Sequence, residues 1–223
     1  AFIKELRAEL VSLLGEDWVK DDPVTLYTYR CDGLTLYNAP PMGVVFPGNR
    51  NELVEVVKKL HSRKIPFVPR GAGTGLSGGA VPREQSVIIE MARFKEIHDI
   101  DWLNRTITVG PGVINLRISE KVQPDGYHYV PDPSSQKACT IGGNVAENSG
   151  GPHTLKYGVT VNHVLGLEMV LPDGEVVELG GKTFPIAGPD MLALVIGSEG
   201  TFGIVTKITC RLTPNPEKAI TLL

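Results

Sequence analysis

Apolar residues recur at helical spacing in two segments of the chain, residues 1–14 and residues 49–64. Spacings of three and four residues place such positions on one face, so both segments are predicted to be amphipathic helices. Asn49 and Glu52 fit a capping box at the start of the second helix. The apolar positions that define the two faces are Phe2, Leu6, Leu10, Leu13, Leu14, Leu53, Val56, Val57 and Leu60.

Two short apolar runs flank the second helix, "GVVFPG" at residues 43–48 and "IPFVPRG" at residues 65–71. Both are predicted to be strands, and together with the helix they form a β-α-β unit. The second strand leads directly into a glycine-rich stretch, "PRGAGTGLSGGAVP" at residues 69–82. Residues 15–41 are rich in turn formers and predict no firm element.

Beyond the glycine-rich stretch the pattern is mainly that of strands with short connections. The Pro-Asp-Gly sequence within residues 163–179 predicts a hairpin. Most connections are too short for parallel crossovers, so the chain is predicted to have an α+β fold with two lobes that meet within residues 80–86. The other predicted elements are strands at residues 86–91, 106–112 and 202–214 and helices at residues 113–122 and 190–200.

Composition excludes several classes of protein. The net charge is −3 and like charges form no block, which argues against a nucleic-acid-binding surface. No apolar run reaches the length of a membrane span, and the N-terminal segment lacks the apolar core of a signal peptide. Three widely spaced cysteines and five scattered histidines match no metal-ligand spacing, so we expect reduced thiols, a cytoplasmic location and no metal site.

The glycine-rich stretch contains "GTGLSG" at residues 73–78, which matches the G-x-G-x-x-G pattern of Rossmann folds. That pattern needs a helix that opens from the loop and holds the pyrophosphate at its N-terminus. Here Pro82 follows, and the next predicted element is a strand, so a Rossmann fold is not expected. The loop's own amides, with the Thr74 and Ser77 hydroxyls, could instead form a nest for an anion. The alternative is a flexible surface loop.

Two further segments repeat this chemistry, residues 131–151 and residues 197–205. Both combine glycine with serine, threonine or asparagine donors. Three such segments in one chain suggest an extended ligand that lies against the backbone over much of its length. For either of the later segments alone, ordinary turns are an equally good explanation.

Five motifs together, which span most of residues 40–215, resemble a known family. They are "PRGAGTGLSGG", "TIGGNVAENSGG", "LKYG", "GLEMVLPDGEVVELG" and "IGSEGTFGIVT". They resemble the PCMH-type FAD-binding domain of the FAD-linked oxidases of the vanillyl-alcohol oxidase type. The resemblance is strongest to the flavoprotein branch that contains the D subunit of glycolate oxidase and the D-lactate and D-2-hydroxyglutarate dehydrogenases.

The resemblance implies two α+β lobes that clasp FAD. Within residues 41–215, lobe one would cover about 41–82 and lobe two about 83–215. Residues 1–40 would supply an N-terminal helix and a connection, and residues 216–223 would begin a substrate (cap) domain that this chain lacks.

The resemblance also implies a set of cofactor-binding residues. Residues 70–76 would wrap the diphosphate, and residues 199–205 would hold the adenine end. Residues 132–140 and 142–143 would line the ribityl chain and the flavin, and residues 147–150 would continue that contact. The full set is Pro69, Arg70, Gly71, Ala72, Gly73, Thr74, Gly75, Ser77, Gly78, Asp132, Pro133, Ser134, Ser135, Cys139, Thr140, Gly142, Gly143, Glu147, Asn148, Ser149, Gly150, Glu199, Gly200, Gly203, Ile204 and Val205.

Further expectations concern how the flavin is attached and what surrounds it. Many relatives tether FAD through a histidine in the first glycine loop, where this chain has Thr74, so the flavin is expected to be non-covalent. His153 lies in a second segment that a few relatives use for tethering. Lys156 and Tyr157 could approach the flavin, or could be a solvent-facing lysine and a packed tyrosine.

The resemblance implies a 2-hydroxy-acid oxidoreductase in which a hydride passes from the substrate α-carbon to flavin N5. The catalytic base, and any metal, would belong to the missing domain, so no catalytic residue is assigned here. Electrons would pass to oxygen, a quinone or an iron–sulfur partner.

Two alternatives remain open. One is a non-catalytic flavin-carrying or assembly subunit of a complex with flavoprotein-like and iron–sulfur subunits. The other is a flavin reductase that acts on a UDP-sugar enolpyruvyl substrate. For the enzyme itself, partner subunits could place a cytoplasmic chain at the periphery of the membrane.

Overall fold

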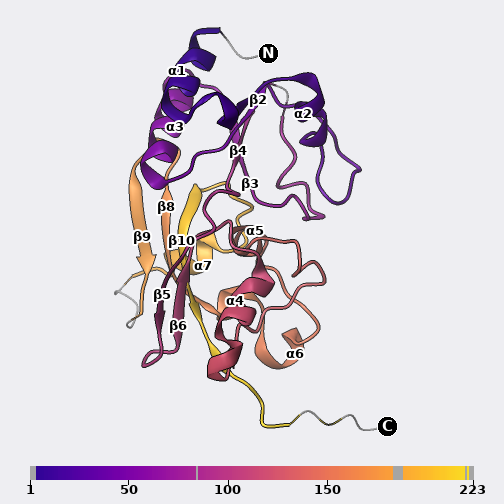
Figure 1. Ribbon diagram of the computed structural model, residues 1–223, viewed down its shortest axis with the longest axis vertical. Coiled ribbons are helices and arrows are strands. Elements are labelled where there is room, and N and C mark those ends of the chain that lie inside the picture. The colour runs from indigo at the N-terminus through magenta and orange to yellow at the C-terminus, as the bar shows by residue number, and fades with distance from the viewer. Residues whose placement is uncertain (1–3, 84, 183–187, 219, 221–223) are drawn as a thin grey trace.

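The computed structural model describes residues 4–83, 85–182, 188–218 and 220, which fold into two units, each built around one sheet (Figure 1). The first sheet has the strand order β1-β2-β4-β3. Strands β2, β4 and β3 run parallel to one another, and β1 pairs antiparallel with β2. The elements of this unit are α1 (Lys4–Leu14), η1 (Glu16–Trp18), β1 (Val19–Lys20), α2 (Pro23–Thr28), β2 (Gly43–Val45), α3 (Arg50–Ser62), β3 (Phe67–Arg70) and β4 (Val87–Glu90).

The two predicted N-terminal helices are α1 and α3, and both bury the predicted apolar faces against the first sheet. Of those positions, Phe2 lies outside the described residues. Asn49 caps α3 by accepting the Glu52 amide at 3.0 Å. The Glu52 carboxylate in turn accepts the Gly48 amide at 2.6 Å. In a standard capping box it would accept the amide of the next residue, the N-cap itself.

The predicted strand after the glycine-rich stretch, β4, lies in the middle of the first sheet. It pairs with β2 on one side and β3 on the other, and all four of its residues are buried. The lobe boundary expected near residue 82 therefore falls inside the first unit. The strand that follows it, β4, pairs in parallel with both strands of the β-α-β unit, β2 and β3. β1, from the segment expected only to connect, also joins this sheet.

The second sheet is antiparallel throughout and has the order β5-β6-β10-β8-β9. β8 and β9 form the predicted hairpin. Helices α4, α5 and α7 lie against this sheet (Figure 1). Strand β7 pairs with β11. The elements are β5 (Ile97–Asp101), β6 (Thr106–Val109), α4 (Asn115–Val122), η2 (Gln123–Asp125), β7 (Tyr127–His128), α5 (Ile141–Glu147), α6 (Thr154–Tyr157), η3 (Thr160–Asn162), β8 (Val164–Val170), β9 (Val176–Gly180), α7 (Met191–Val195), β10 (Ile204–Arg211) and β11 (Thr213–Pro214).

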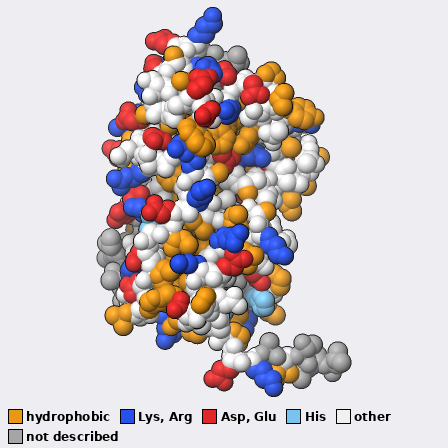
Figure 2. Space-filling view, in the orientation of Figure 1, with side chains coloured by type: hydrophobic (Ala, Val, Ile, Leu, Met, Phe, Trp, Pro, Cys, Tyr) orange, Lys and Arg blue, Asp and Glu red, His pale blue; other side chains and the backbone are white. Residues whose placement is uncertain are grey.

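Several elements were absent from the sequence-based prediction. Helix α2 buries none of its residues and is held by Asp22, whose carboxylate accepts the Thr25 amide at 2.9 Å, with Pro23 in the first turn. Its apolar side chains Val24 and Tyr27 are exposed, and Figure 2 shows apolar surface over this helix at the upper right. Without a buried face there is no apolar stripe for a periodicity argument to find.

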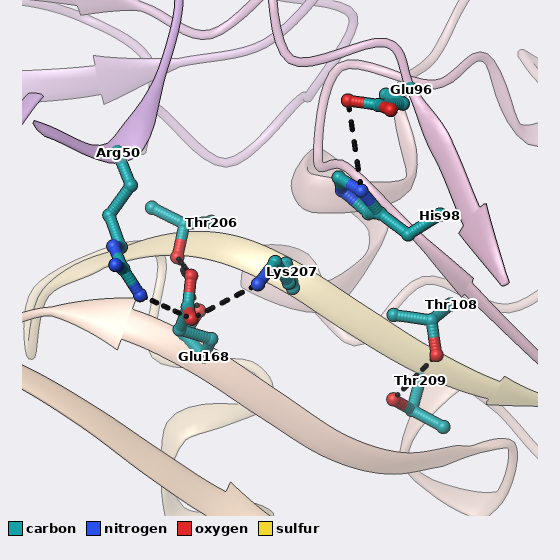
Figure 3. A network of polar contacts seen from close by, with 8 residues as sticks. All are labelled: Arg50, Glu96, His98, Thr108, Glu168, Thr206, Lys207 and Thr209. Carbon is teal, nitrogen blue, oxygen red and sulfur yellow. Dashed lines mark hydrogen bonds and ion pairs between the residues drawn. The ribbon is translucent and has the colours of Figure 1, made fainter. Parts of the chain in front are cut away.

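The two units share buried residues and a polar cluster. Val170 of β8 and Ile204 of β10 pack into the core of the first unit. Beside them, Arg50 of α3 reaches the carboxylate of Glu168 on β8 (Figure 3). These contacts fix α3, the helix of the β-α-β unit, to the second sheet.

The described residues also include the cysteines and the side chains that can bind metals. In the described ranges the cysteines are free thiols, and no group of three or more metal-binding side chains is present. Each described helix is too short or too polar to cross a lipid bilayer.

Candidate functional site

Three segments that are far apart in the sequence line one cavity of about 510 Å³ between the two units. The first is the glycine-rich stretch after β3, the second surrounds α5, and the third runs from α7 into β10 (Figure 1). These are the three segments in which the sequence combines glycine with small polar residues. The cavity therefore has walls that are mostly backbone and small side chains.

The first wall, residues 71–80, is here called the glycine loop. None of the amides from Gly71 to Ser77 donates to another group in the described part of the chain. Gly73 has φ +65°, and a Cβ there would collide with the Arg70 guanidinium, so this position admits only glycine without strain. A row of free amides beside a cavity can receive an anion that offers several acceptor oxygens.

The second wall differs from the sequence-based expectation, which was a polar turn. Residues 141–147 form helix α5, with Thr140 as its N-cap. Its first amides are occupied: Ile141 donates to the Val113 carbonyl at 2.8 Å and Gly142 to the Pro111 carbonyl at 2.9 Å. The start of α5 therefore supplies close-packed backbone to the cavity wall, while the free donors belong to the glycine loop.

The third wall is fastened to the end of α5. The Gly197 amide donates to the Val145 carbonyl at 2.9 Å, and the Glu199 amide donates to the Ala146 carbonyl at 2.8 Å. Glu199 adopts φ +55°, a conformation that is uncommon outside glycine. The two bonds hold this turn in place and bring the second and third walls together.

Two carboxylates lie beside the far end of the glycine loop. Glu147 accepts the Ser77 hydroxyl at 2.8 Å, and Glu199 also lines the cavity. Burial raises the pKa of Glu147, the Ser77 bond lowers it, and the charges of Glu199 and Asp32 raise it further, for a net increase. Protonation of Glu147 therefore becomes easier in the folded protein than in an open chain.

Most of the residues predicted as cofactor contacts line this cavity, and the three that do not are Gly78, Asp132 and Asn148. The Gly78 amide donates to Asp32 at 2.9 Å, and Asp132 pairs with His153 at 2.6 Å. Asn148 ends α5 with φ +49° and accepts the Val161 amide at 2.9 Å. These three residues therefore make hydrogen bonds next to the cavity walls without lining the cavity themselves.

The cavity also has lining residues that the sequence reasoning missed. Most are neighbours of the predicted residues within the same three segments. Met91 and Pro111 lie outside all three, next to strands β4 and β6, and no motif in the sequence marks them. The missed residues are Leu76, Gly79, Ala80, Met91, Pro111, Asn144, Val145, Ala146, Val195 and Ser198.

Lys156 and Tyr157, expected either near a flavin or at the surface, do not line the cavity. The Lys156 ammonium lies 4.7 Å from the centre of the Tyr157 ring, and Lys156 is exposed. The alternative of a solvent-facing lysine describes this arrangement better. His153 is also exposed and is paired with Asp132.

A two-unit α+β fold with a backbone-lined cavity between the units, and no helix opening from the glycine loop, defines a class of dinucleotide-binding protein that is distinct from the Rossmann type. The sequence profile described as "FAD binding domain" matches residues 41–180. The chain therefore belongs to this family of FAD-binding domains, and its cofactor is FAD.

The curated relatives of this chain include proteins named glycolate oxidase subunit GlcD and D-lactate dehydrogenase. The chain is 50% identical over 195 residues to the glycolate oxidase subunit GlcD of Escherichia coli K12, covering 87% of this chain and 39% of the relative. It is 41% identical over 221 residues to GlcD of Bacillus subtilis, covering 99% and 47%. It is 41% identical over 172 residues to a D-lactate dehydrogenase of Archaeoglobus fulgidus, covering 77% and 38%. The chain thus spans less than half the length of these relatives.

Among solved structures, the chain is similar to alkyldihydroxyacetonephosphate synthase, with a TM-score of 0.86 and 24% identity. The match covers 98% of this chain and 42% of that structure. At this identity the similarity concerns the fold, which is the vanillyl-alcohol oxidase type expected from the sequence motifs.

Proposed function

We propose that this chain is the flavin-binding part of an oxidoreductase that acts on small D-2-hydroxy acids. The row of free amides from Gly71 to Ser77 carries the proposal, because a diphosphate offers acceptor oxygens to several donors at once. The names of the relatives, glycolate oxidase and D-lactate dehydrogenase, supply the substrate class.

In this proposal the glycine loop receives the FAD diphosphate through backbone amides, since the described cavity wall offers no lysine. Residues 133–150 line the flavin side and residues 198–205 the adenine side. When bound, the flavin supplies a hydride acceptor for the substrate α-carbon. Thr74 occupies the tethering position of some relatives, so attachment is non-covalent.

This chain's residues bind and orient the cofactor, and the base that takes the substrate hydroxyl proton comes from elsewhere in the working enzyme. The cavity wall offers carboxylates, Glu147 and Glu199, but Glu147 is committed to Ser77. GlcD is named as a subunit, and we propose that this chain likewise works within a larger oxidoreductase in the cytoplasm or at its membrane face.

The test is a titration of the purified chain with FAD, followed by flavin fluorescence and by the resolution of fine structure in the flavin absorption band. We expect saturable binding at micromolar FAD and competition by ADP, which carries the same diphosphate. Retention of flavin through denaturation would contradict non-covalent attachment. Absence of binding at micromolar FAD would contradict the cofactor site itself.

A second measurement tests the substrate class. Protein expressed from the complete reading frame, loaded with FAD, should reduce a dye acceptor with D-lactate or glycolate and much more slowly with L-lactate. Flavin binding without reduction by any 2-hydroxy acid would favour the non-catalytic carrier alternative.

A further inference from the structure

The carboxylate of Asp32 lies behind the glycine loop and is almost completely buried, with 5% of the residue exposed. Oδ1 accepts the Leu34 amide at 3.0 Å, and Oδ2 accepts the Gly78 amide at 2.9 Å. Among the described residues, no ion pair within 4.0 Å includes this carboxylate. A buried charge that is satisfied by backbone amides fixes the position of both amides strongly.

Further hydrogen bonds tie residues 31–34, here called the brace, to the glycine loop, one of them directly and two through Arg70. The Gly33 amide donates to the Gly75 carbonyl at 3.0 Å. The guanidinium of Arg70, 8% exposed, donates to the Cys31 carbonyl at 2.9 Å and to the Ala80 carbonyl at 3.0 Å. Brace and loop also touch closely, because a Cβ on Gly33 would lie 2.9 Å from the Thr74 carbonyl oxygen.

These contacts divide the polar groups of the loop between two sides. The Gly75 and Ala80 carbonyls and the Gly78 amide are engaged by the brace and Arg70, while the amides of residues 71–77 keep no protein partner among the described residues. Three backbone groups of the loop are thereby hydrogen-bonded on the side that faces the brace and Arg70, and they are not free to bond within the loop.

We propose that Asp32 is a positioning residue that holds the glycine loop in its diphosphate-binding shape before the cofactor arrives. The proposal rests on the proposed FAD site and adds a role for a segment outside the matched family region, residues 41–180. A glycine-rich loop loses much conformational entropy on ordering. When the brace orders it in advance, binding no longer carries that cost.

Two explanations of how the Asp32 carboxylate could affect FAD binding, its negative charge or its hydrogen bonds to the loop, predict opposite results. If the carboxylate acted on FAD only through its charge, removal would strengthen binding of the anionic diphosphate. If it acts as a brace, removal weakens binding. Asp32→Ala should therefore raise the Kd for FAD about tenfold or more, the usual effect of losing a hydrogen bond to a charged group.

The experiment compares Asp32→Ala with Asp173→Ala in purified protein of the same length. Asp173 is the matched control because its carboxylate accepts an amide two residues ahead, Glu175 at 2.9 Å, as Asp32 does with Leu34, but it lies in the exposed β8–β9 hairpin. Measurements are the FAD Kd, the Kd of riboflavin, which lacks phosphate, and hydrogen exchange of Gly33 and Gly78 without cofactor.

We expect Asp32→Ala to weaken FAD but not riboflavin, and to speed exchange at Gly33 and Gly78, with Asp173→Ala matching the wild type. Gly33→Ala, which keeps the carboxylate but crowds the Thr74 carbonyl, should weaken FAD in the same way and covers the case in which Asp32→Ala fails to fold. Unchanged or tighter FAD binding in a folded variant overturns the brace. Absence of FAD binding by the wild type overturns the proposed function instead.

Discussion

Arg50 of α3 and Glu168 of β8 form an ion pair of 3.1 Å that crosses from one unit of the protein to the other (Figure 3). Glu168 is 5% exposed and is also contacted by Lys207 at 3.3 Å and by the Thr206 hydroxyl at 2.7 Å. Burial alone would raise the pKa of Glu168, but Thr206, Lys207 and Arg50 together bring it below the ordinary value. The carboxylate therefore stays charged at neutral pH and links the two units between which the cavity lies.

Thr206→Val should destabilise the protein by about 1–3 kcal/mol, because a buried carboxylate oxygen loses its hydroxyl donor while the side-chain volume hardly changes. The free energy of unfolding, measured by urea denaturation, checks this value. Thr209→Val is the control on the same strand: its hydroxyl meets only Thr108 at 3.2 Å and is half-buried, so we expect a change within about 0.5 kcal/mol. Equal effects of the two changes would contradict the importance of the Glu168 cluster.

Glu90 at the end of β4 should make the protein less stable as the pH rises. Burial raises its pKa to about 7 from an ordinary 4.5, opposed by the charge of Arg70 and by the amides of Ala92 and Met91. The folded protein thus holds this proton more tightly than the unfolded chain, so the contribution of Glu90 to stability is fully present below pH 4.5 and is lost as the pH rises through 7.

Glu90→Gln removes that titration and keeps an oxygen acceptor. The variant should gain on the order of 2 kcal/mol over the wild type at pH 8 and little at pH 4.5. Urea denaturation across this pH range measures the difference. A wild type and a variant with parallel pH profiles would show that Glu90 does not titrate in this window.

Glu147→Gln should tighten FAD binding at neutral and higher pH. The wild-type carboxylate lines the cavity, and its negative charge opposes an anionic diphosphate. Because its pKa is raised, lowering the pH protonates it, so wild-type affinity for FAD should increase as the pH falls. The variant, which can still accept the Ser77 hydroxyl, should lose this dependence. Glu175→Gln in the β8–β9 turn serves as control, and identical pH profiles in all three proteins would contradict the prediction.

Gly73→Ala should weaken FAD binding by about tenfold or more, because a side chain at φ +65° strains the loop and pushes on the Arg70 guanidinium. Gly126→Ala is the matched control: φ is +83°, but nothing lies within 4 Å of the added Cβ. Both variants should unfold more easily by about 1 kcal/mol, whereas only Gly73→Ala should change the Kd for FAD. Fluorescence titration and urea denaturation separate the two effects.

Local patterns predicted the elements that have a strong periodic signal. The apolar faces of α1 and α3, the β8–β9 hairpin and the strand β10 were all visible in the chain, because each depends on residues a few positions apart. The glycine loop was recognised for the same reason. Helices α2 and α5 were missed, since α2 has no buried face and α5 contains two glycines near its start.

The pattern of residues along the chain was enough to predict an α+β fold and a glycine loop that is not of the Rossmann type, and the likeness of five motifs to a known family pointed to an FAD-binding domain. Packing between segments dozens of residues apart decided which sheet β4 joins and that Met91 and Pro111 line the cavity. It also decided that Asp32 holds the Gly78 amide behind the glycine loop. The physical reason is that a local pattern reports which face of an element is apolar, whereas its partner is chosen by the free energy of the whole packed chain.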